Sequence, residues 1–210
     1  GISHVEVALN TATDKSEVRS AELVSTASYQ NMNDDVVVND LLQKYDSKIA
    51  DANKVLGYNS SYRTGEYLQQ IIADLYYETG VKEWGKKYDI ALGGGFMSVR
   101  SPYNLKAGDV TYADIQSLFP FDNQLVLCSV KGRELKNKFF ETNNNRYYIS
   151  YGDYGESIRQ NIDYNATYYV VVDTYSAYYA ANKLTVVEEY KPDVFGRDLL
   201  AEYIKNGGLS

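Results

Sequence analysis

The sequence predicts an α+β fold, in which helices and strands intermix without the strict βαβ rhythm of an all-parallel sheet. Residues 168–173 form an apolar run of the kind found in central strands. Stripes of apolar residues at helical spacing run through 38–52, 68–76 and 135–140, between shorter strand patterns. We therefore expect helices packed on strands, with some parallel pairing allowed.

The first segment, residues 1–33, is mostly polar. Residues 4–9 alternate apolar and polar side chains, which predicts a strand with one solvated face. Residues 15–30 continue as strand and loop without a core-sized apolar run. We expect this segment to be an edge piece of a larger unit.

One long helix is predicted for residues 34–56. Asn33 and Asp34 supply the N-cap chemistry, and Gly57 follows the last apolar pair as a stop. Because polar residues cover its other face, this helix is interpreted as a connector between domains. Its apolar stripe consists of Val38, Leu41, Leu42, Tyr45, Ile49 and Ala52.

Residues 57–210 carry the patterns of a compact domain. A loop at 59–61 precedes a second helix, which is expected to end near Gly80. Residues 88–92 form a short buried strand that runs into Gly93–Gly95, where a turn is expected. The apolar face of the second helix consists of Leu68, Ile71, Ile72, Leu75 and Tyr76.

Shorter elements follow. Thr111 is expected to open a helix, because Asp114 is placed as in a capping box. Residues 119–123 are expected to form a loop, because Pro120 fits neither a helix interior nor a strand ladder. The other predicted elements are strands at 124–130, 147–151 and 168–173 and helices at 133–141 and 197–205.

Composition excludes several kinds of site. The chain of 210 residues has 22 tyrosines but a single histidine, His4, which cannot build a histidine-rich metal centre. A single cysteine, Cys128, excludes an internal disulfide and a cysteine-based zinc site.

The formal net charge of −7 argues against nucleic acid and anionic membranes as partners. No apolar run is long enough to span a membrane, and Gly1 without a preceding methionine indicates a fragment.

Gly93, Gly94 and Gly95 are the first candidate site residues. Consecutive glycines let the backbone approach a ligand closely and present N–H groups to an anion. A tight turn without a ligand is the simpler interpretation. The spacing is not that of a dinucleotide-binding loop, and no P-loop lysine follows.

Two aromatic residues are candidates for stacking on a planar ring. Phe121 lies in the loop stiffened by Pro120, whereas Phe119 is interpreted as a core residue. Ten of the tyrosines fall between Tyr147 and Tyr179, a concentration that fits either a ligand cleft or half-buried strands. Tyr175 is the best of them, because it follows the apolar strand, where a ligand crevice often opens.

Arg63, before the second helix, and Arg100, after the glycines, are placed where they can hold a phosphate or carboxylate. Solvated surface positions are the simpler interpretation for both. Aspartate and glutamate are plentiful, but no spacing marks a catalytic pair.

The order of these motifs resembles the C-terminal domain of the 5′-nucleotidase family, which includes UDP-sugar hydrolases and 2′,3′-cyclic-nucleotide phosphodiesterases. The resemblance covers roughly residues 57–210 and is most specific over 88–136. It implies a layered α/β/β/α-type domain with mixed sheets, preceded by the family's inter-domain helix and by the tail of an N-terminal domain. The motifs are Gln-Ile-Ile-Ala-Asp at 70–74, Gly93–Gly95, Gly-Asp-Val-Thr-Tyr at 108–112, Leu-Phe-Pro-Phe-Asp-Asn at 118–123, Lys-Gly-Arg-Glu-Leu-Lys at 131–136 and Tyr-x-Val-Val-x-x-Tyr at 169–175.

The resemblance also implies a division of labour. In the family, the N-terminal metallophosphatase domain holds two divalent metal ions and hydrolyses the phosphoester, while the C-terminal domain binds the nucleotide or nucleoside. This chain would then be an inactive fragment without a cofactor of its own, whose partners are the substrate and its own N-terminal domain. An extracytoplasmic location is implied as well.

By position, Phe121 and Tyr175 match the two base-stacking aromatics of the family, and Asn123 matches the asparagine of the same loop. Gly93–Gly95 match the glycine turn near the ligand, and Arg63 falls close to an arginine that reaches substrate.

Departures from the family leave the substrate open. Leu92 replaces an asparagine, residues 179–182 lack the usual carboxylate, and Arg100 replaces the family's arginine only if the loop carries an insertion. Two alternatives remain: a non-catalytic carbohydrate-binding module that uses the tyrosines of 147–179, and the same enzyme family acting on another phosphoester.

Overall fold

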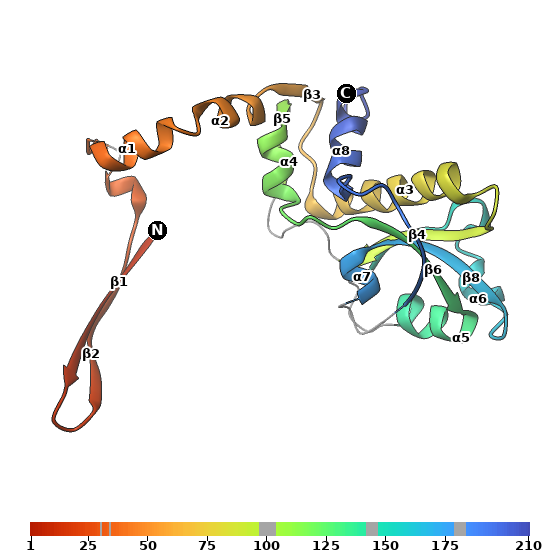
Figure 1. Ribbon diagram of the computed structural model, residues 1–210, viewed down its shortest axis with the longest axis horizontal. Helices are drawn as coiled ribbons and strands as arrows, with labels where there is room; N and C mark the ends of the chain where they lie inside the picture. The colour runs from red at the N-terminus through yellow and green to blue at the C-terminus, as the bar shows by residue number, and fades with distance from the viewer. Residues whose placement is uncertain (30, 34, 97–103, 142–146, 179–183) are drawn as a thin grey trace. The chain divides into compact units, whose positions relative to one another are not determined.

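A computed structural model describes residues 1–29, 31–33, 35–96, 104–141, 147–178 and 184–210 (Figure 1). The chain divides into two compact units, residues 1–49 and residues 50–210. Within the described ranges, no helix is long and apolar enough to cross a membrane.

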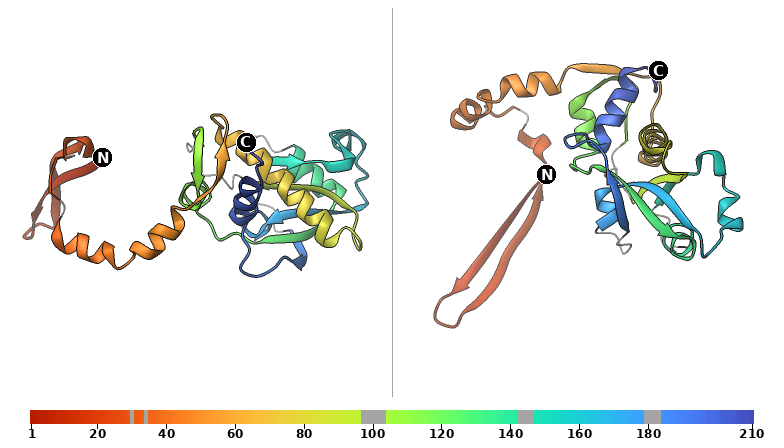
Figure 2. Two further views of the ribbon diagram at one scale, coloured as in Figure 1. Left: turned by 90° about the horizontal axis from the view of Figure 1, so that it is seen from above. Right: turned by 45° about the vertical axis from the view of Figure 1, so that its right-hand side comes forward.

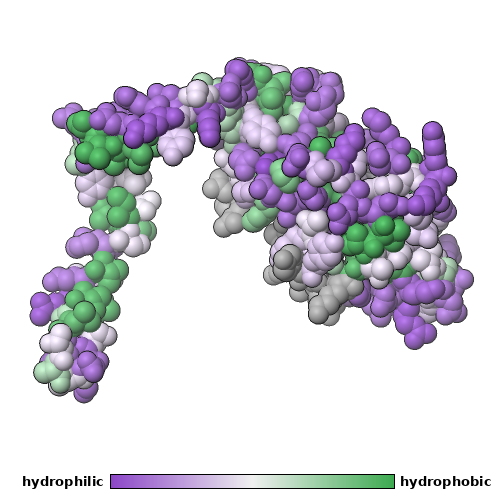
Figure 3. All heavy atoms as spheres, viewed as in Figure 1, coloured by the Kyte–Doolittle hydropathy of each residue, from purple (hydrophilic) through white to green (hydrophobic). Residues whose placement is uncertain are grey.

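The first unit is a β-hairpin followed by helices. β1 (Ile2–Asn10) pairs antiparallel with β2 (Lys15–Val24), and a bulge at Glu6/Val7 shifts the register. The predicted strand is confirmed, but nearly all of its side chains are exposed on both faces, and apolar atoms are visible along the hairpin (Figure 3). The large apolar residues exposed in β1 and β2 are Ile2, Val5, Val7, Leu9, Val18 and Leu23.

The single helix predicted for residues 34–56 is instead two helices and a strand. A short 3-10 helix (Thr26–Tyr29) precedes α1 (Val36–Gln43), which is followed by α2 (Asp46–Ala52). Asp35 caps α1 in place of the expected Asn33: its carboxylate accepts the N–H groups of Val37 and Val38. Asp34, the other expected cap, lies outside the described residues. The residues expected to end the helix belong to a strand, β3 (Val55–Asn59).

The second unit is built on a five-stranded sheet in the order β7-β4-β8-β6-β9. β8 is central, as its apolar sequence predicts. It runs parallel to β4 and antiparallel to β6, so the sheet is mixed and the predicted α+β class is confirmed. A second sheet pairs β3 with β5 (Gly108–Thr111). The strands of the large sheet are β4 (Ile90–Phe96), β6 (Leu125–Lys131), β7 (Tyr147–Ser150), β8 (Thr167–Asp173) and β9 (Thr185–Glu189).

Helices cover both faces of this sheet (Figures 1 and 2). α3 (Gly65–Trp84), α4 (Tyr112–Leu118) and α8 (Gly196–Lys205) share one apolar core with Val171 of β8. α5 (Gly132–Leu135), a π-helical turn (Lys136–Phe140) and α7 (Thr174–Tyr178) share the other core with Val170 and Val172. Successive side chains of a strand point to opposite faces, so the run Val170–Val172 contributes to both cores.

The expected glycine turn is wrong, because Gly93, Gly94 and Gly95 lie inside β4. They are buried, and their backbone pairs with β7. A Cβ added to Gly93 would lie 2.3 Å from the backbone nitrogen of Tyr77 on α3, and one added to Gly94 would lie 2.7 Å from the carbonyl oxygen of Tyr148. Glycine is therefore required here for close packing of α3 and β7 against the strand.

Other local predictions hold. Thr111 and Asp114 form the expected capping box at the start of α4, and the helix predicted for 197–205 is α8, followed by Gly207 at φ +84°.

Other elements differ from the prediction. The second helix, α3, continues past Gly80 to Trp84. A short α6 (Ile158–Asn161) and the elements α7 and β9 were not predicted from the sequence.

Candidate functional site

The topology brings the loop at 119–124 and helix α7 to one edge of the large sheet. β6 and β8 are antiparallel neighbours, with Leu125 opposite Asp173. The N–H of Thr174 donates to the carbonyl oxygen of Gln124 at 2.8 Å. The start of β6 and the end of β8 are therefore adjacent, and so are the segments attached to them.

Phe121 and Tyr175 both lie on these adjacent segments. The two residues are 41% and 42% exposed, respectively, although Leu125 and Asp173, where their segments join the sheet, are fully buried. A partly exposed aromatic ring that is held by a rigid element is suited to stacking on a planar ring. We refer to the loop at 119–124 together with residues 173–175 as the candidate site.

The loop is anchored on both sides of Phe121. Phe119 is fully buried in the core, which confirms its assignment as a core residue. On the other side, the carbonyl oxygen of Asn123 accepts the N–H of Gly196 at 3.1 Å. Gln124 forms an isolated bridge with Phe195. Residues 120–122 therefore span a short distance between fixed points.

A buried arginine contacts the middle of the loop. Arg197, 7% exposed, donates from one terminal nitrogen to the carbonyl oxygen of Phe121 at 2.9 Å. Its other terminal nitrogen lies 2.5 Å from a carboxylate oxygen of Asp122. Its Nε donates to the hydroxyl of Tyr112 at 3.2 Å, and that hydroxyl donates to Asp198 at 2.8 Å. Burial raises the pKa of Tyr112; the hydrogen bond from Arg197 opposes this effect and the hydrogen bond to the Asp198 carboxylate adds to it, so the pKa is raised overall and the hydroxyl stays protonated at neutral pH.

Helix α7 is fixed by its own cap. The carboxylate of Asp173, which is fully buried, accepts the N–H of Ser176 at 2.6 Å. A carboxylate that accepts an N–H of the first turn stabilises the start of a helix. Tyr175 therefore follows the strand directly, as expected, on a turn with a fixed orientation.

Arg63 lies near the carboxyl end of β4, which is the end of the sheet where Tyr175 follows the parallel strand β8. The Gln70 side chain donates to the carbonyl oxygen of Ile149, opposite Gly94 in β7, and Trp84 lies next to the start of β4. α3 therefore runs antiparallel to β4, and Arg63 precedes its first turn. The guanidinium of Arg63 lies 4.7 Å from the ring centroid of Tyr67, and its Nε is buried without a hydrogen-bond partner among the described residues. The other candidate arginine, Arg100, lies outside the described residues.

Several tyrosines of the region 147–179 have partners within the domain. The ring of Tyr151 packs against Phe140 with centroids 6.1 Å apart. The hydroxyl of Tyr154 donates to Asp89, and that of Tyr164 accepts from Lys136. These contacts fit the interpretation of the tyrosine surplus as half-buried structural residues.

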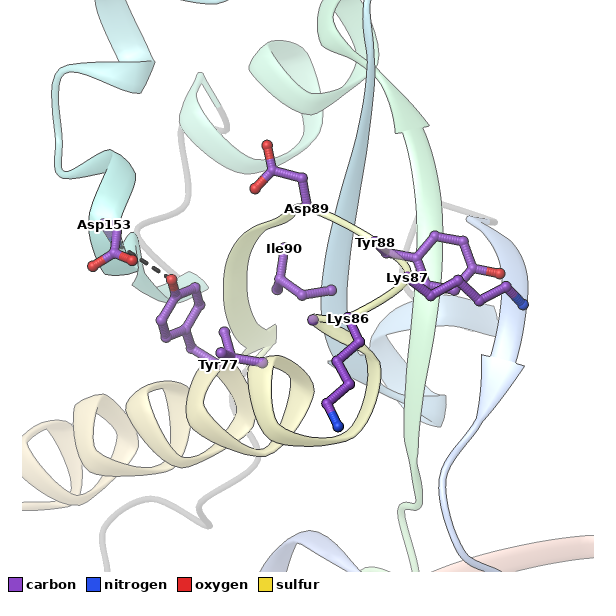
Figure 4. A pocket seen from close by; sticks show the side chains of 9 residues that line it. Tyr77, Lys86, Lys87, Tyr88, Asp89, Ile90 and Asp153 are labelled. Atoms are coloured by element: carbon purple, nitrogen blue, oxygen red, sulfur yellow. Dashed lines mark hydrogen bonds between the residues drawn. The ribbon is translucent and has the colours of Figure 1, made fainter.

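A cavity of about 370 Å³ lies elsewhere, at the amino end of β4 (Figure 4). Most of its polar groups already have partners. Asp89 accepts the hydroxyl of Tyr154, and the Tyr77 hydroxyl accepts the N–H of Asp153. The side chains of Lys87 and Tyr88 both bind Glu188. The cavity is lined by Tyr77, Val81, Gly85, Lys86, Lys87, Tyr88, Asp89, Ile90 and Asp153.

No group of three or more histidine, cysteine, aspartate or glutamate side chains is placed to hold a metal ion in the described part of the chain. His4, on β1, pairs with Glu22 at 3.1 Å. Cys128 is fully buried, and burial raises the pKa of its thiol to about 12. Neither His4 nor Cys128 therefore forms part of a metal cluster among the described residues.

Arg197 is the functional candidate that the sequence did not reveal. A signal was present, because an arginine in the first turn of a helix faces the positive end of the helix dipole. Such a position is favourable when a carboxylate or carbonyl oxygen outside the helix binds the cation. The pattern did not indicate that these acceptors belong to the loop of Phe121.

Comparison with known proteins agrees with the fold. The family model described as the 5′-nucleotidase C-terminal domain matches residues 48–156. No curated protein matches the chain.

Solved structures with the same fold are longer proteins. The 5′-nucleotidase precursor from Thermus thermophilus is 18% identical with a TM-score of 0.63, and the match covers 97% of this chain and 46% of that one. The NAD nucleotidase from Haemophilus influenzae is 16% identical with a TM-score of 0.51, over 96% of this chain and 45% of that one. A sulfate thiohydrolase from Thermus thermophilus is 12% identical with a TM-score of 0.54, over 91% of this chain and 40% of that one.

At these identities the structures establish the fold alone, and this chain spans less than half the length of each of them. The family model, by contrast, matches just over half of the chain. The chain belongs to the family of 5′-nucleotidase C-terminal domains.

Proposed function

We propose that residues 57–210 are the nucleotide- or nucleoside-recognition domain of a two-domain, metal-dependent phosphoesterase of the 5′-nucleotidase type. The base would stack between Phe121 and Tyr175. One observation carries this proposal: two aromatic side chains, each about two-fifths exposed, stand on adjacent segments at the same sheet edge. Each stacked face contributes on the order of 1–3 kcal/mol to binding.

Polar contacts would complete recognition. The half-buried Asn123 has a side-chain amide suited to the polar edge of a nucleoside. Arg63 and Arg100 would attract the phosphate. We leave Gly93–Gly95 out of the proposed contacts, because they pack beneath α3 and against β7.

Hydrolysis would be performed by a separate N-terminal domain that binds two divalent metal ions, and the present chain alone would be inactive. We propose that residues 1–33 complete that domain and that residues 34–56 connect the two. The hairpin supports this assignment, since it exposes apolar residues such as Leu9 (74%) and Leu23 (76%) that a two-stranded hairpin cannot bury by itself. An extracytoplasmic location is part of the proposal, and the description of the similar Thermus protein as a precursor supports it.

The substrate within the family is a separate question. The similar structures include a 5′-nucleotidase and a NAD nucleotidase, so a base-containing phosphoester is the first class to test. The carbohydrate alternative receives no specific support, because Tyr151 and Tyr154 are engaged within the domain.

Isothermal titration of the 210-residue chain with adenosine, uridine, AMP and UDP-glucose tests the proposal. Binding of at least one nucleoside is expected, with no release of phosphate from AMP in the presence of Mg²⁺ or Mn²⁺. Tryptophan fluorescence is a poor reporter, because Trp84 lies at the amino end of β4, away from the candidate site. A chain that binds none of the four compounds, or that hydrolyses AMP in a sustained manner, would contradict the proposal.

A further inference from the structure

The guanidinium of Arg197 is buried at the start of α8, where the helix dipole alone would disfavour a cation. A buried charge is tolerated when charged or polar partners satisfy it. All three nitrogens of Arg197 have such partners, and its carbon Cζ also lies 4.6 Å from the ring centroid of Phe195.

Two of these partners belong to the loop that carries Phe121. One is the backbone carbonyl oxygen of Phe121 itself, at 2.9 Å, and the other is the carboxylate of Asp122, at 2.5 Å. The Asp122 side chain is 69% exposed, so its ion pair with Arg197 is partly screened by solvent. Arg197 therefore holds the loop at two consecutive residues, Phe121 and Asp122.

The side chain of Phe121 is far more exposed than that of its neighbour Phe119. Phe121 is 41% exposed, whereas Phe119 is fully buried. Pro120 restricts one backbone angle, Asn123 is tied to Gly196, and Arg197 binds the backbone between these two points. The third contact of Arg197, to Tyr112, joins this loop to α4 and α8.

We propose that Arg197 is a positioning residue that holds Phe121 in the orientation needed for stacking on a base. The inference rests on the proposed function of Phe121, and it adds a residue that never touches the ligand. Ordering this loop before binding removes an entropic cost that the ligand would otherwise have to offset. Loss of Arg197 should therefore weaken binding through Phe121 and not through the rest of the domain.

Fluorine NMR tests the positioning directly, without any ligand. The chain contains six phenylalanines, which can be replaced by 4-fluorophenylalanine, and the Phe121 signal is identified by its loss in Phe121→Leu. In Arg197→Gln the Phe121 signal should move towards its position in the urea-unfolded chain. The signal of Phe139, in the core on the opposite sheet face, should stay unchanged. Arg133→Gln is the matched control, since Arg133 is an exposed arginine in the first turn of α5.

A double-mutant cycle tests the functional consequence, with adenosine as the probe. Arg197→Gln should weaken adenosine binding several-fold in the wild-type background but leave it unchanged in the Phe121→Ala background. If Arg197 only stabilised the fold, Arg197→Gln would weaken adenosine binding equally in the two backgrounds. An unmoved Phe121 signal in Arg197→Gln, or equal losses in the two backgrounds, would overturn the inference.

The outcomes separate the two proposals. If the wild-type chain binds none of adenosine, uridine, AMP and UDP-glucose, the proposed function is contradicted, while the fluorine signal still decides whether Arg197 holds Phe121. If Arg197→Gln does not fold, Arg197→Lys takes its place, because a single ammonium keeps the charge but cannot bind Tyr112, the Phe121 carbonyl and Asp122 in the same geometry. The Phe121 signal should again move, and an unmoved signal would refute the positioning role.

Discussion

Replacing Gly93 with alanine tests why β4 contains three consecutive glycines. The added Cβ would lie 2.3 Å from the backbone nitrogen of Tyr77, 2.7 Å from its Cα and 2.8 Å from the carbonyl oxygen of Ala73. Ordinary contacts between heavy atoms are roughly 3.5–4 Å, so α3 would have to move away by about 1 Å. Because all three atoms are backbone, no side chain can rotate to make room.

The sign of the effect distinguishes this explanation from conformational entropy. Gly93 does not have a positive φ angle, so its backbone conformation is open to alanine. Without the clash, Gly93→Ala should stabilise the chain by about 0.4–1 kcal/mol. With the clash, overpacking should destabilise it by about 1–3 kcal/mol.

Urea unfolding followed by circular dichroism measures the change, with Gly80→Ala as the matched control on the same helix. A Cβ at Gly80 would meet the Val171 side chain, with Cγ2 at 2.2 Å. In a Val171→Ala background, Gly80→Ala should therefore no longer destabilise the chain, because the clash is removed and alanine has the higher helix propensity. The same background should not reduce the destabilisation caused by Gly93→Ala. If Gly93→Ala raises the free energy of unfolding, or if Val171→Ala rescues it, the packing argument is refuted.

Two further predictions concern single side chains. Thr64→Ala should lower the free energy of unfolding by about 1 kcal/mol, because the Thr64 hydroxyl accepts the N–H of Tyr67 as the N-cap of α3. Thr64→Ser keeps a hydroxyl and should change this free energy little. If chemical denaturation shows equal decreases for the two variants, the cap is contradicted. Cys128 should not react with Ellman's reagent at pH 8 until the chain unfolds, because its thiol is buried with a pKa of about 12. In the unfolded chain the Cys128 thiol ionises near pH 8.5, whereas in the folded chain it ionises near pH 12. The protonated thiol therefore contributes fully to the free energy of unfolding below pH 8.5, and this contribution declines as the pH rises towards about 12. If Cys128→Ala shows the same decline, the decline does not come from this thiol.

Patterns that depend on local chemistry were predictable from the sequence. The apolar run in β8 indicated a central strand, and it occupies the middle of the five-stranded sheet. The Thr111 and Asp114 pair indicated the capping box of α4. In each case the residues that determine the structure are close together in the chain.

The two glycine errors have one physical cause. Gly57 was interpreted as a helix stop and Gly93 as part of a turn, yet both lie in strands. A Cβ on Gly57 would lie 2.5 Å from the carbonyl oxygen of Ile204 on α8, just as one on Gly93 would meet α3. Close approach of a helix backbone to a strand depends on residues distant in sequence, so a local pattern cannot distinguish it from a turn.

In the candidate site, too, the individual residues were predictable from local patterns, whereas their arrangement was not. Phe121 and Tyr175 were selected individually from a proline-stiffened loop and from the end of an apolar strand. Their adjacency follows from the antiparallel pairing of β6 with β8, and the contact of Arg197 with the loop follows from the packing of α8. Neither long-range relation is encoded in a local motif.

The central claim is that Phe121 and Tyr175 stack on a nucleoside base. Titration calorimetry of adenosine with Phe121→Ala, Tyr175→Ala and the double variant tests it most directly. Tyr164→Ala is the matched control, because Tyr164 is also 42% exposed but lies before the opposite end of β8. Each substitution at the candidate site should weaken binding by about 5- to 150-fold, corresponding to about 1–3 kcal/mol per stacked face, while Tyr164→Ala leaves it unchanged. Unchanged adenosine affinity in the double variant would contradict the account.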